Sequence, residues 1–247
     1  MKIIKKIFLF FDVILWNVPT KYYEKYKFNK KLKNAKNKIN EFIKNNKIPK
    51  LQIGTGGKSH FIDGWLNTCI CDSGKTIYLD ATKSFPIENN KFDYIFSEHF
   101  IEHITFEQAV FHLNECFRIL KHGGKIRIVT PNLEALTILH NNNNITEIQK
   151  KYLENTYEMW LKSNDFPKQS ELFDVFTINN FFYSWGHKFI YDLKTLKYVI
   201  NKCGFRKIKQ CKIGSSEDDN LNGIETHHLD TSIEMNNYES IVVEAIK

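Results

Sequence analysis

The stretch LQIGTGG, at residues 51–57, decides the fold predicted for this chain. A largely apolar segment that runs directly into glycines is typical of a buried strand followed by a tight turn. Because glycine has no Cβ, the backbone of such a turn can approach a ligand closely. The same turn also fits a purely structural role. It is not a GxGxxG motif, and it lacks the Gly-Lys-Ser/Thr ending of a phosphate-binding loop.

Short apolar runs, separated by Gly, Asp and Asn, continue from this stretch towards the C-terminus. Their alternation predicts an α/β fold with a Rossmann-like, mainly parallel sheet and an antiparallel C-terminal strand. We expect helices at 98–120, 133–140 and 191–203, and a turn at Gly123-Gly124. The expected strands cover residues 51–53, 65–71, 76–79, 92–97, 125–130, 205–213 and 240–246.

The length of 247 residues suits one α/β domain with extensions. We expect a helical N-terminal extension at 1–48 and the Rossmann-like domain at 49–247, with a helical, aromatic-rich cover at about 145–190. The net charge is +7, and fourteen Lys residues lie among the first fifty. Since no basic motif is interleaved with aromatic residues, nucleic acid is not an expected partner.

The segment IFLFFDVILW, at residues 7–16, follows three lysines and imitates a signal peptide. Asp12 interrupts the run, no small-residue cleavage site follows it, and it is too short to span a bilayer. One interpretation is a helix docked on the domain. The other is a peripheral membrane contact through residues 1–17, with the lysines at the headgroups. We expect a cytoplasmic protein, with this membrane association left open.

The chain has five cysteines, an odd number, and most lie within predicted strands or helices. This usage favours reduced thiols in an intracellular protein over a disulfide framework. Cys69 and Cys71 would point to the same face of one strand. We expect both thiols to pack in the core, and no metal site is predicted there.

An ordered series of motifs follows the glycine turn. The series consists of Asp80-Ala81, SFP at 84–86, KFDYI at 91–95, SEHFIEH at 97–103, RILKHGGK at 118–125 and Pro131-Asn132. Over residues 51–132 it resembles the class I S-adenosylmethionine-dependent methyltransferases, in particular the small bacterial type associated with surface-polysaccharide biosynthesis. The resemblance implies an enzyme with S-adenosylmethionine as its cofactor. The implied acceptor is a hydroxyl of a sugar or of another small molecule.

The resemblance also implies which residues bind the cofactor. The glycine turn would approach the methionine end, Asp80 would accept a hydrogen bond from the adenine amino group, and His99 would face the methionine portion and the substrate. The implied cofactor-binding residues are Gly54, Thr55, Gly56, Gly57, Asp80, Ala81, Ser97 and His99. The residues alone leave another role open for Asp80, that of a turn or N-cap carboxylate.

One position departs from the family pattern. Where the family usually carries an acidic residue for the ribose hydroxyls, at the end of the second strand, this chain has Cys69. A thiol is a poor partner for two hydroxyls. A catalytically inactive binding or scaffold protein is therefore the alternative function. A nicotinamide-dependent enzyme ranks last, because it would need the same acidic residue and a GxGxxG motif.

Two histidines are the catalytic candidates. An oxygen nucleophile often needs a base, and histidine has the most suitable pKa. His99 follows a predicted strand end, and His187 lies beside Gly186 in an aromatic stretch that suits a lid. The region 145–187 would shape the acceptor pocket.

Three further histidines are given structural interpretations. We expect His103 to pack at a helix start. The pattern H-x-x-E-H at 99–103 is also compatible with metal ligation, but the motif series explains it better, and no metal is predicted. We expect His227 and His228 to lie in a solvated loop.

Overall fold

The computed structural model describes residues 18–56, 60–71, 76–141, 145–162 and 173–247. Its centre is a seven-stranded sheet in the order β3-β2-β1-β4-β5-β7-β6. All pairs from β3 to β5 are parallel, whereas β7 pairs antiparallel with both β5 and β6. The predicted Rossmann-like sheet with an antiparallel C-terminal strand is confirmed. The strands are β1 Lys50–Ile53, β2 Leu66–Cys69, β3 Ile77–Tyr78, β4 Phe92–Glu98, β5 Leu120–Pro131, β6 Arg206–Cys211 and β7 Ser240–Ile246.

The strand register determines which residues meet at the carboxyl edge of the sheet. Ile53, the last residue of β1, is paired with Ser97 of β4 on one side and with Thr68 of β2 on the other. The glycine turn after β1 therefore lies next to the residues that follow β4. In open α/β sheets this edge is where ligands bind.

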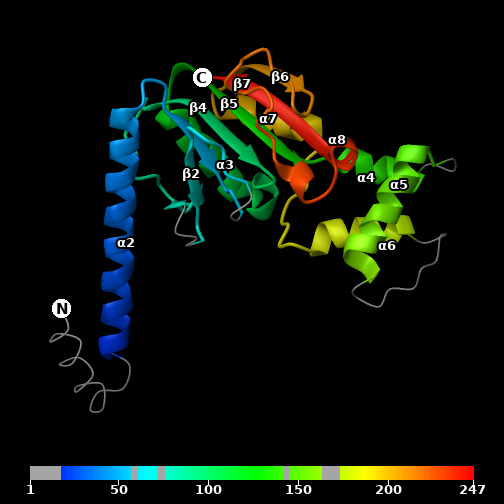
Figure 1. Ribbon diagram of the computed structural model, residues 1–247, viewed down its shortest axis with the longest axis horizontal. Coiled ribbons are helices and arrows are strands. Elements are labelled where there is room, and N and C mark those ends of the chain that lie inside the picture. The colour runs from blue at the N-terminus through cyan, green and yellow to red at the C-terminus, as the bar shows by residue number, and fades with distance from the viewer. Residues whose placement is uncertain (1–17, 57–59, 72–75, 142–144, 163–172) are drawn as a thin grey trace.

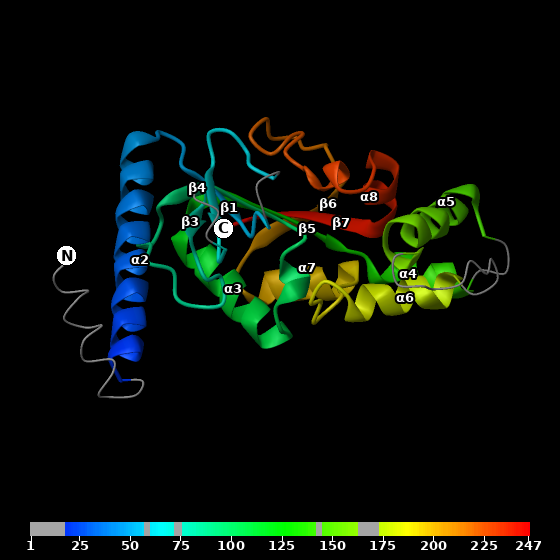
Figure 2. The same cartoon turned by 60° about the horizontal axis from the view of Figure 1, so that its bottom comes forward.

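The two faces of the sheet are covered differently (Figure 2). Helices α3 (Phe106–Ile119) and α7 (Leu193–Lys202) pack on one face, where they bury an apolar core with β1, β4 and β5. The segment 212–232 lies over the other face, where Leu221 joins Trp65 and Phe96 in a smaller cluster. Both faces of β4 are thereby removed from water, as in most parallel sheets.

The helix after β4 begins later than predicted. In place of one helix over 98–120, a short 3-10 turn, η1 (Ile101–His103), precedes α3. His99 has a positive φ of 45°, which is incompatible with a continuing α-helix. Thr105 then caps α3 in a capping box with Gln108. Strand β5 also includes the expected Gly123-Gly124 turn, as an irregularity in its pairing with β4.

A helical layer extends beyond the carboxyl edge of the sheet (Figure 1). It has its own apolar cluster, in which Tyr152, Phe181 and Met235 from three helices are buried. Its elements are α4 Leu133–Asn141, α5 Glu147–Thr156, the π-helical turn η2 Tyr157–Leu161, α6 Phe173–Tyr183, the 3-10 turn η4 His227–Leu229 and α8 Ile233–Glu239. Within residues 145–190, where a helical cover is expected, the described elements include α5, η2 and α6.

The N-terminal part contains the long helix α2 (Val18–Asn45), which packs on the β3 edge of the sheet (Figure 1). Ala35 and Ile39 are its buried contacts, and Phe28 meets the ring of Tyr78 edge-on. The apolar segment 7–16 lies outside the described residues. Among the helices that are described, none is long and apolar enough to cross a membrane.

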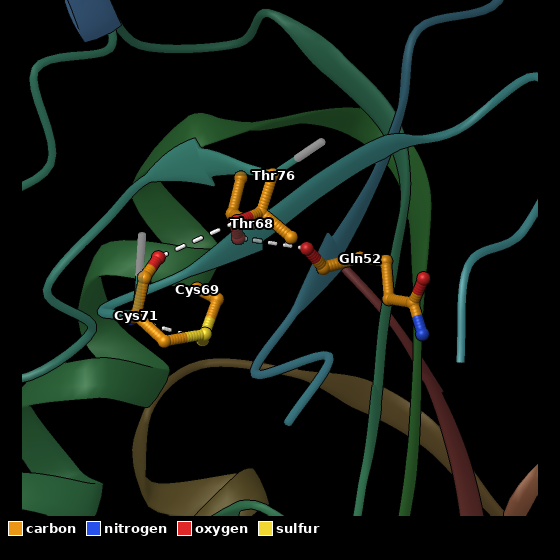
Figure 3. The surroundings of a disulfide bond; sticks show 5 residues. All are labelled: Gln52, Thr68, Cys69, Cys71 and Thr76. Atoms are coloured by element: carbon orange, nitrogen blue, oxygen red, sulfur yellow. Dashed lines mark hydrogen bonds between the residues drawn. A yellow bond between two sulfur atoms is a disulfide. The ribbon is translucent and has the colours of Figure 1, made fainter. Parts of the chain in front are cut away.

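The cysteine prediction was wrong at one pair. Cys69 and Cys71 form a disulfide at the end of β2 (Figure 3). The strand geometry explains the pairing, because residues two apart point to the same face. Cys116 and Cys203 are free and buried, as expected, and Cys211 is free and half-buried.

Candidate active site

A cavity of about 760 Å³ lies at the carboxyl edge of the sheet, beneath the helical layer. The glycine turn after β1 and the residues after β4 form one side of it. Helices α5 and α8 and the end of α6 form the other side. The cavity brings together Gly54, Thr55, Gly56, His99 and His187 of the predicted site. Gly57 lies outside the described residues.

The glycine turn has the close backbone packing that its sequence predicts. Gly54 has a φ of 77°, and a Cβ placed there would lie 2.6 Å from the ring of Phe100. Gly56 also has a positive φ, of 62°, but a Cβ there would meet no atom within 4 Å among the described residues. The N–H groups of Gly54 and Thr55 donate to the carbonyl of Thr68. The turn is therefore fixed to β2, and the open side lies at Gly56.

Three predicted cofactor residues do not line the cavity: Asp80, Ala81 and Ser97. Asp80 Oδ1 accepts hydrogen bonds from the backbone N–H and the hydroxyl of Thr82, at 3.0 and 2.7 Å. This is the turn-carboxylate role that the sequence left open. Ala81 and Ser97 are buried. Their roles toward a cofactor stay predictions.

His99 occupies the bend between β4 and η1. Its Nδ1 lies 3.4 Å from Glu102 Oε1, and its Nε2 lies 3.2 Å from the hydroxyl of Ser240. Because the Ser240 hydroxyl donates to Asn236 Oδ1, it can only accept from His99, which places a proton on His99 Nε2. Burial alone lowers the pKa of His99, but the hydrogen bond and charge of Glu102, with Glu239 and Glu98, raise it above its ordinary value.

Glu102 is the most deeply buried carboxylate in the cavity wall, with no exposed surface. Its Oε2 accepts from the hydroxyl of Thr130 at 3.0 Å. Its Oε1 has no hydrogen bond of regular geometry among the described residues, although His103 Nε2 lies 3.9 Å away in addition to His99. Burial alone raises the pKa of Glu102. The imidazoles of His99 and His103 lower it by a larger amount, so the pKa lies below its ordinary value.

His187 reaches this cluster through the turn after α6. Trp185 and Gly186 both have positive φ, which reverses the chain, and Lys188 N then donates to the Glu102 carbonyl at 2.7 Å. His187 Nδ1 donates to the Phe181 carbonyl at 2.6 Å, so Nε2 is the nitrogen left for a ligand. Burial lowers the pKa of His187. The imidazole is therefore neutral at neutral pH.

Two histidines of the cavity wall were assigned wrongly or incompletely from the sequence. His227 is not in a solvated loop, because its ring stacks on His99 and its Nε2 lies 3.3 Å from Glu239 Oε1. His103 lines the cavity, with its ring 4.9 Å from that of His187. The 226–230 segment gave no sequence signal, because its position depends on Glu98, whose Oε2 accepts from the backbone N–H groups of Thr226 and His227.

Residues 66–128 match a family model described as a methyltransferase domain. This part of the chain, about a quarter of its length, is similar to a methyltransferase domain. The matched segment runs from β2 into β5 and includes the H-x-x-E-H pattern. It confirms the predicted class, an enzyme that uses S-adenosylmethionine for methyl transfer. No curated protein matches the chain.

Solved methyltransferase structures are similar to this chain at low sequence identity. An S-adenosylmethionine-dependent methyltransferase from Archaeoglobus fulgidus has 15% identity and a TM-score of 0.44, over 92% of this chain and 99% of that one. A possible histamine N-methyltransferase from Thermotoga maritima has 14% identity and a TM-score of 0.40, over 94% and 100%. A phosphoethanolamine N-methyltransferase 2 from Haemonchus contortus, in complex with S-adenosyl-L-methionine, has 16% identity and a TM-score of 0.40, over 87% and 52%. The fold assignment rests on the strand order and register given above.

The cavity wall beside the glycine turn fits the amino-acid end of S-adenosylmethionine. Gln52 Oε1, Thr55 Oγ1 and Glu98 Oε1 are buried, and none has a hydrogen-bond partner among the described residues. All three residues line the cavity beside the glycine turn. Carbonyl and carboxylate oxygens suit an ammonium group, and a hydroxyl can donate to a carboxylate. Buried polar atoms without partners are costly, so a ligand that satisfies them binds favourably.

The chain departs from the methyltransferase pattern at the position expected to face the ribose. The sulfur atoms of Cys69 and Cys71 are bonded to each other at the end of β2, and the Cys71 backbone N–H points to Cys69 Sγ at 3.1 Å (Figure 3). A disulfide offers no carboxylate to two ribose hydroxyls. The amino-acid end is therefore the better-equipped half of the cofactor site.

Proposed function

We propose that this protein transfers a methyl group from S-adenosylmethionine to a hydroxyl of a sugar or a similar small polyhydroxylated acceptor in surface-polysaccharide biosynthesis. One observation carries the proposal. The glycine turn and the two predicted catalytic histidines, His99 and His187, border a single cavity. A donor held at the turn and an acceptor held at the histidines would share that space.

The cofactor is assigned to the β1 end of the cavity. Gln52 Oε1 and Glu98 Oε1 would accept from its ammonium group, and the Thr55 hydroxyl would donate to its carboxylate. Bound there, S-adenosylmethionine supplies an electrophilic methyl group on a sulfonium. Asp80 and Ala81 are assigned to the adenine, in agreement with the family resemblance. Gly56 leaves the room that the methionine portion needs.

His99 is assigned as the general base. With one proton already on Nε2, its Nδ1 is the nitrogen that can take the acceptor's hydroxyl proton, beside Glu102 Oε1. The negative charge of the neighbouring carboxylate would stabilise the imidazolium that forms. The acceptor oxygen bonds to the methyl carbon as the bond from sulfur to that carbon breaks, and S-adenosylhomocysteine leaves. A pKa raised above 6.5 brings His99 nearer to neutral pH, which suits a base.

The cover suits a sugar. The rings of Tyr152, Phe181 and Trp185 line the cavity opposite the turn, and the polar groups of Asn155 and Thr156 lie among them. Aromatic faces pack against the apolar C–H surface of a pyranose, while amides and hydroxyls bind its hydroxyls. His187 Nε2 is assigned to the acceptor hydroxyl.

The proposal is tested first by cofactor binding. In calorimetry with S-adenosylhomocysteine, we expect saturable binding to the wild type. Gly54→Ala should abolish it, because its Cβ would meet Phe100. The control is Gly223→Ala, since Gly223 also has a positive φ but is exposed and does not line the cavity. Absence of binding at millimolar ligand would overturn the proposal.

Turnover is tested next, by formation of S-adenosylhomocysteine with a panel of monosaccharides, nucleotide sugars and glycan fragments. We expect activity with at least one hydroxylated acceptor, and a loss of turnover on the order of 100-fold in His99→Gln with a much smaller change in cofactor affinity. Cofactor binding without turnover on the whole panel would favour the inactive binding protein. Methylation of amines alone would contradict a hydroxyl acceptor.

A further inference from the structure

Two groups of potential metal ligands line the cavity, and they differ in geometry. One consists of His99, His227 and Glu239, and the other of Glu102, His103 and His187. Within each group, one nitrogen or oxygen atom per residue lies within 4.8 Å of the others. The two groups are neighbours, because His99 Nδ1 is 3.4 Å from Glu102 Oε1.

In the first group, the imidazoles of His99 and His227 do not converge on one ion. The rings of His99 and His227 are stacked, 27° from parallel, with their centroids 3.7 Å apart. The nitrogen lone pairs lie in the ring planes, so an ion in the plane of one ring lies well outside the plane of the other. Glu239 Oε2 is also engaged, by the hydroxyl of Tyr152 at 2.9 Å. His99, His227 and Glu239 therefore form a packed polar network.

The second group has converging ligands. The planes of His103 and His187 cross at 66°, with centroids 4.9 Å apart, so their in-plane nitrogens can meet at one point. His187 Nδ1 donates to a backbone carbonyl, which is the outer-shell bond that fixes a ligating histidine with Nε2 free. Glu102 Oε2 is likewise oriented by Thr130, while Oε1 faces the imidazoles without a regular hydrogen bond.

The charge around Glu102 points to a cation as well. Its carboxylate is completely buried, and among the described residues its ion-pair partners are imidazoles, with no Lys or Arg within 4 Å. A buried carboxylate is costly unless it is paired or bound to a metal. The backbone reinforces the arrangement, since Lys188 N and Phe189 N both donate to the Glu102 carbonyl and hold His187 beside it.

We propose that Glu102, His103 and His187 bind one divalent first-row transition-metal ion, such as Zn²⁺, Mn²⁺ or Co²⁺. Two imidazoles and one carboxylate are a ligand set for these ions, and three protein ligands leave positions open for a substrate. The hard ion Mg²⁺ prefers oxygen ligands and is not the expected occupant.

The site deepens the proposed function, on which its role in the reaction rests. An acceptor hydroxyl bound to the ion at Glu102 would lie beside His99 Nδ1, the atom assigned to take its proton. The ion would lower the pKa of that hydroxyl. In this arrangement His187 acts on the acceptor through the ion. Metal binding itself requires neither the cofactor nor the acceptor.

The test is calorimetric titration of the full-length, tag-free, metal-stripped protein with ZnCl₂, repeated with CoCl₂ while the visible absorption of Co²⁺ is recorded. We expect one equivalent to bind. His103→Gln and His187→Gln should each weaken binding by at least about 10-fold, the range seen when support for a ligand is lost. Glu102→Gln, which keeps the shape of the side chain, should do the same. His140→Gln is the control, because His140 is exposed and pairs with Asp174 outside the cavity.

Three outcomes would overturn the inference: no stoichiometric binding of either ion, unchanged affinity in both His103→Gln and His187→Gln, or loss of binding in His227→Gln alone, which would move the ion to the other group. The proposed function has separate readouts. Turnover that persists in excess chelator would contradict the role of the ion in the reaction, and neither metal binding nor the proposed function. Metal binding by a protein that does not bind S-adenosylhomocysteine would contradict the proposed function alone.

Discussion

The rings of His99 and His227 stack, with their centroids 3.7 Å apart, and so join the strand end of β4 to the 3-10 turn η4 before α8. His227 Nε2 lies 3.3 Å from Glu239 Oε1, so the same residue connects the proposed base to a second carboxylate. The 226–230 segment is docked on Glu98, and the stack that it provides holds the His99 ring in place.

His227→Leu should lower turnover by about 10-fold or more while cofactor affinity stays within about twofold, since the variant disturbs the orientation of the base and leaves the glycine turn intact. His228→Leu is the matched control, because His228 is adjacent in sequence but does not line the cavity. Steady-state kinetics and calorimetry separate the two effects. Equal losses in both variants would contradict a specific role for the stack.

Thr55→Val should have opposite effects on stability and on cofactor binding. The hydroxyl of Thr55 is buried without a partner among the described residues, so its removal should stabilise the free protein by about 1 kcal/mol. Affinity for S-adenosylhomocysteine should fall. Thr68→Val is the control. It removes a hydroxyl that has a partner, since Thr68 Oγ1 donates to the Gln52 carbonyl at 2.7 Å (Figure 3). That variant should be destabilised. Urea denaturation measures both, and a destabilised Thr55→Val would contradict the assignment.

Arg127→Met should destabilise the fold by about 3–5 kcal/mol, the usual effect of leaving a buried charge without its partner. The Arg127 side chain is fully buried on β5 and pairs with Glu225, which is also buried, and with Glu244. Arg127 also donates to the carbonyls of Lys212 and Ser215. The double variant Arg127→Met/Glu225→Leu should recover part of the loss in urea denaturation. No recovery would show that the carbonyl contacts dominate.

His112 should make stability depend on pH. Burial lowers its pKa from 6.5 to about 4, and the ring is packed between Phe85 and Phe100. Because the pKa of His112 is lower in the folded state than in the unfolded state, protonation of the imidazole stabilises the unfolded state relative to the folded state. The free energy of unfolding should therefore fall by about 3 kcal/mol as the pH drops from 6.5 towards 4. Above pH 6.5, His112 should make no contribution to the pH dependence.

The pH effect is isolated by comparison with His112→Leu, which should lose this part of the slope in denaturation measured at several pH values. His122→Gln, at an exposed position, serves as the control. A slope that is the same in wild type and His112→Leu would contradict the buried neutral imidazole.

Thiol titration of the unfolded protein should find three free cysteines before reduction and five after it, because Cys69 and Cys71 are bonded. Cys71→Ser should show four thiols without reductant. Five thiols in the untreated wild type would contradict the disulfide in solution. The affinity for S-adenosylhomocysteine can be compared between the oxidised and the reduced samples, because the disulfide lies where the ribose is expected.

Several features were predictable from the sequence because their causes are local. The apolar run 51–53, the glycines after it and the alternation along the chain determined the strands, the mainly parallel sheet and the position of the turn. Gly54 illustrates the reason, since its positive φ and its contact with Phe100 admit no side chain. His99 and His187 were also found from local context, by their places at a strand end and in an aromatic turn.

The composition of the cavity depended on contacts distant in sequence, and only the tertiary structure decided it. His227 was missed because the Glu98 carboxylate, not a local pattern, positions its segment. Helix α3 begins at Phe106 because of the backbone at His99 and the cap at Thr105. The sequence by itself thus determined the sheet, the turn and two histidines. The pairing of Glu102 with His103 and His187 follows only when β4, η1 and the turn after α6 meet, because ligand geometry is a property of packed elements.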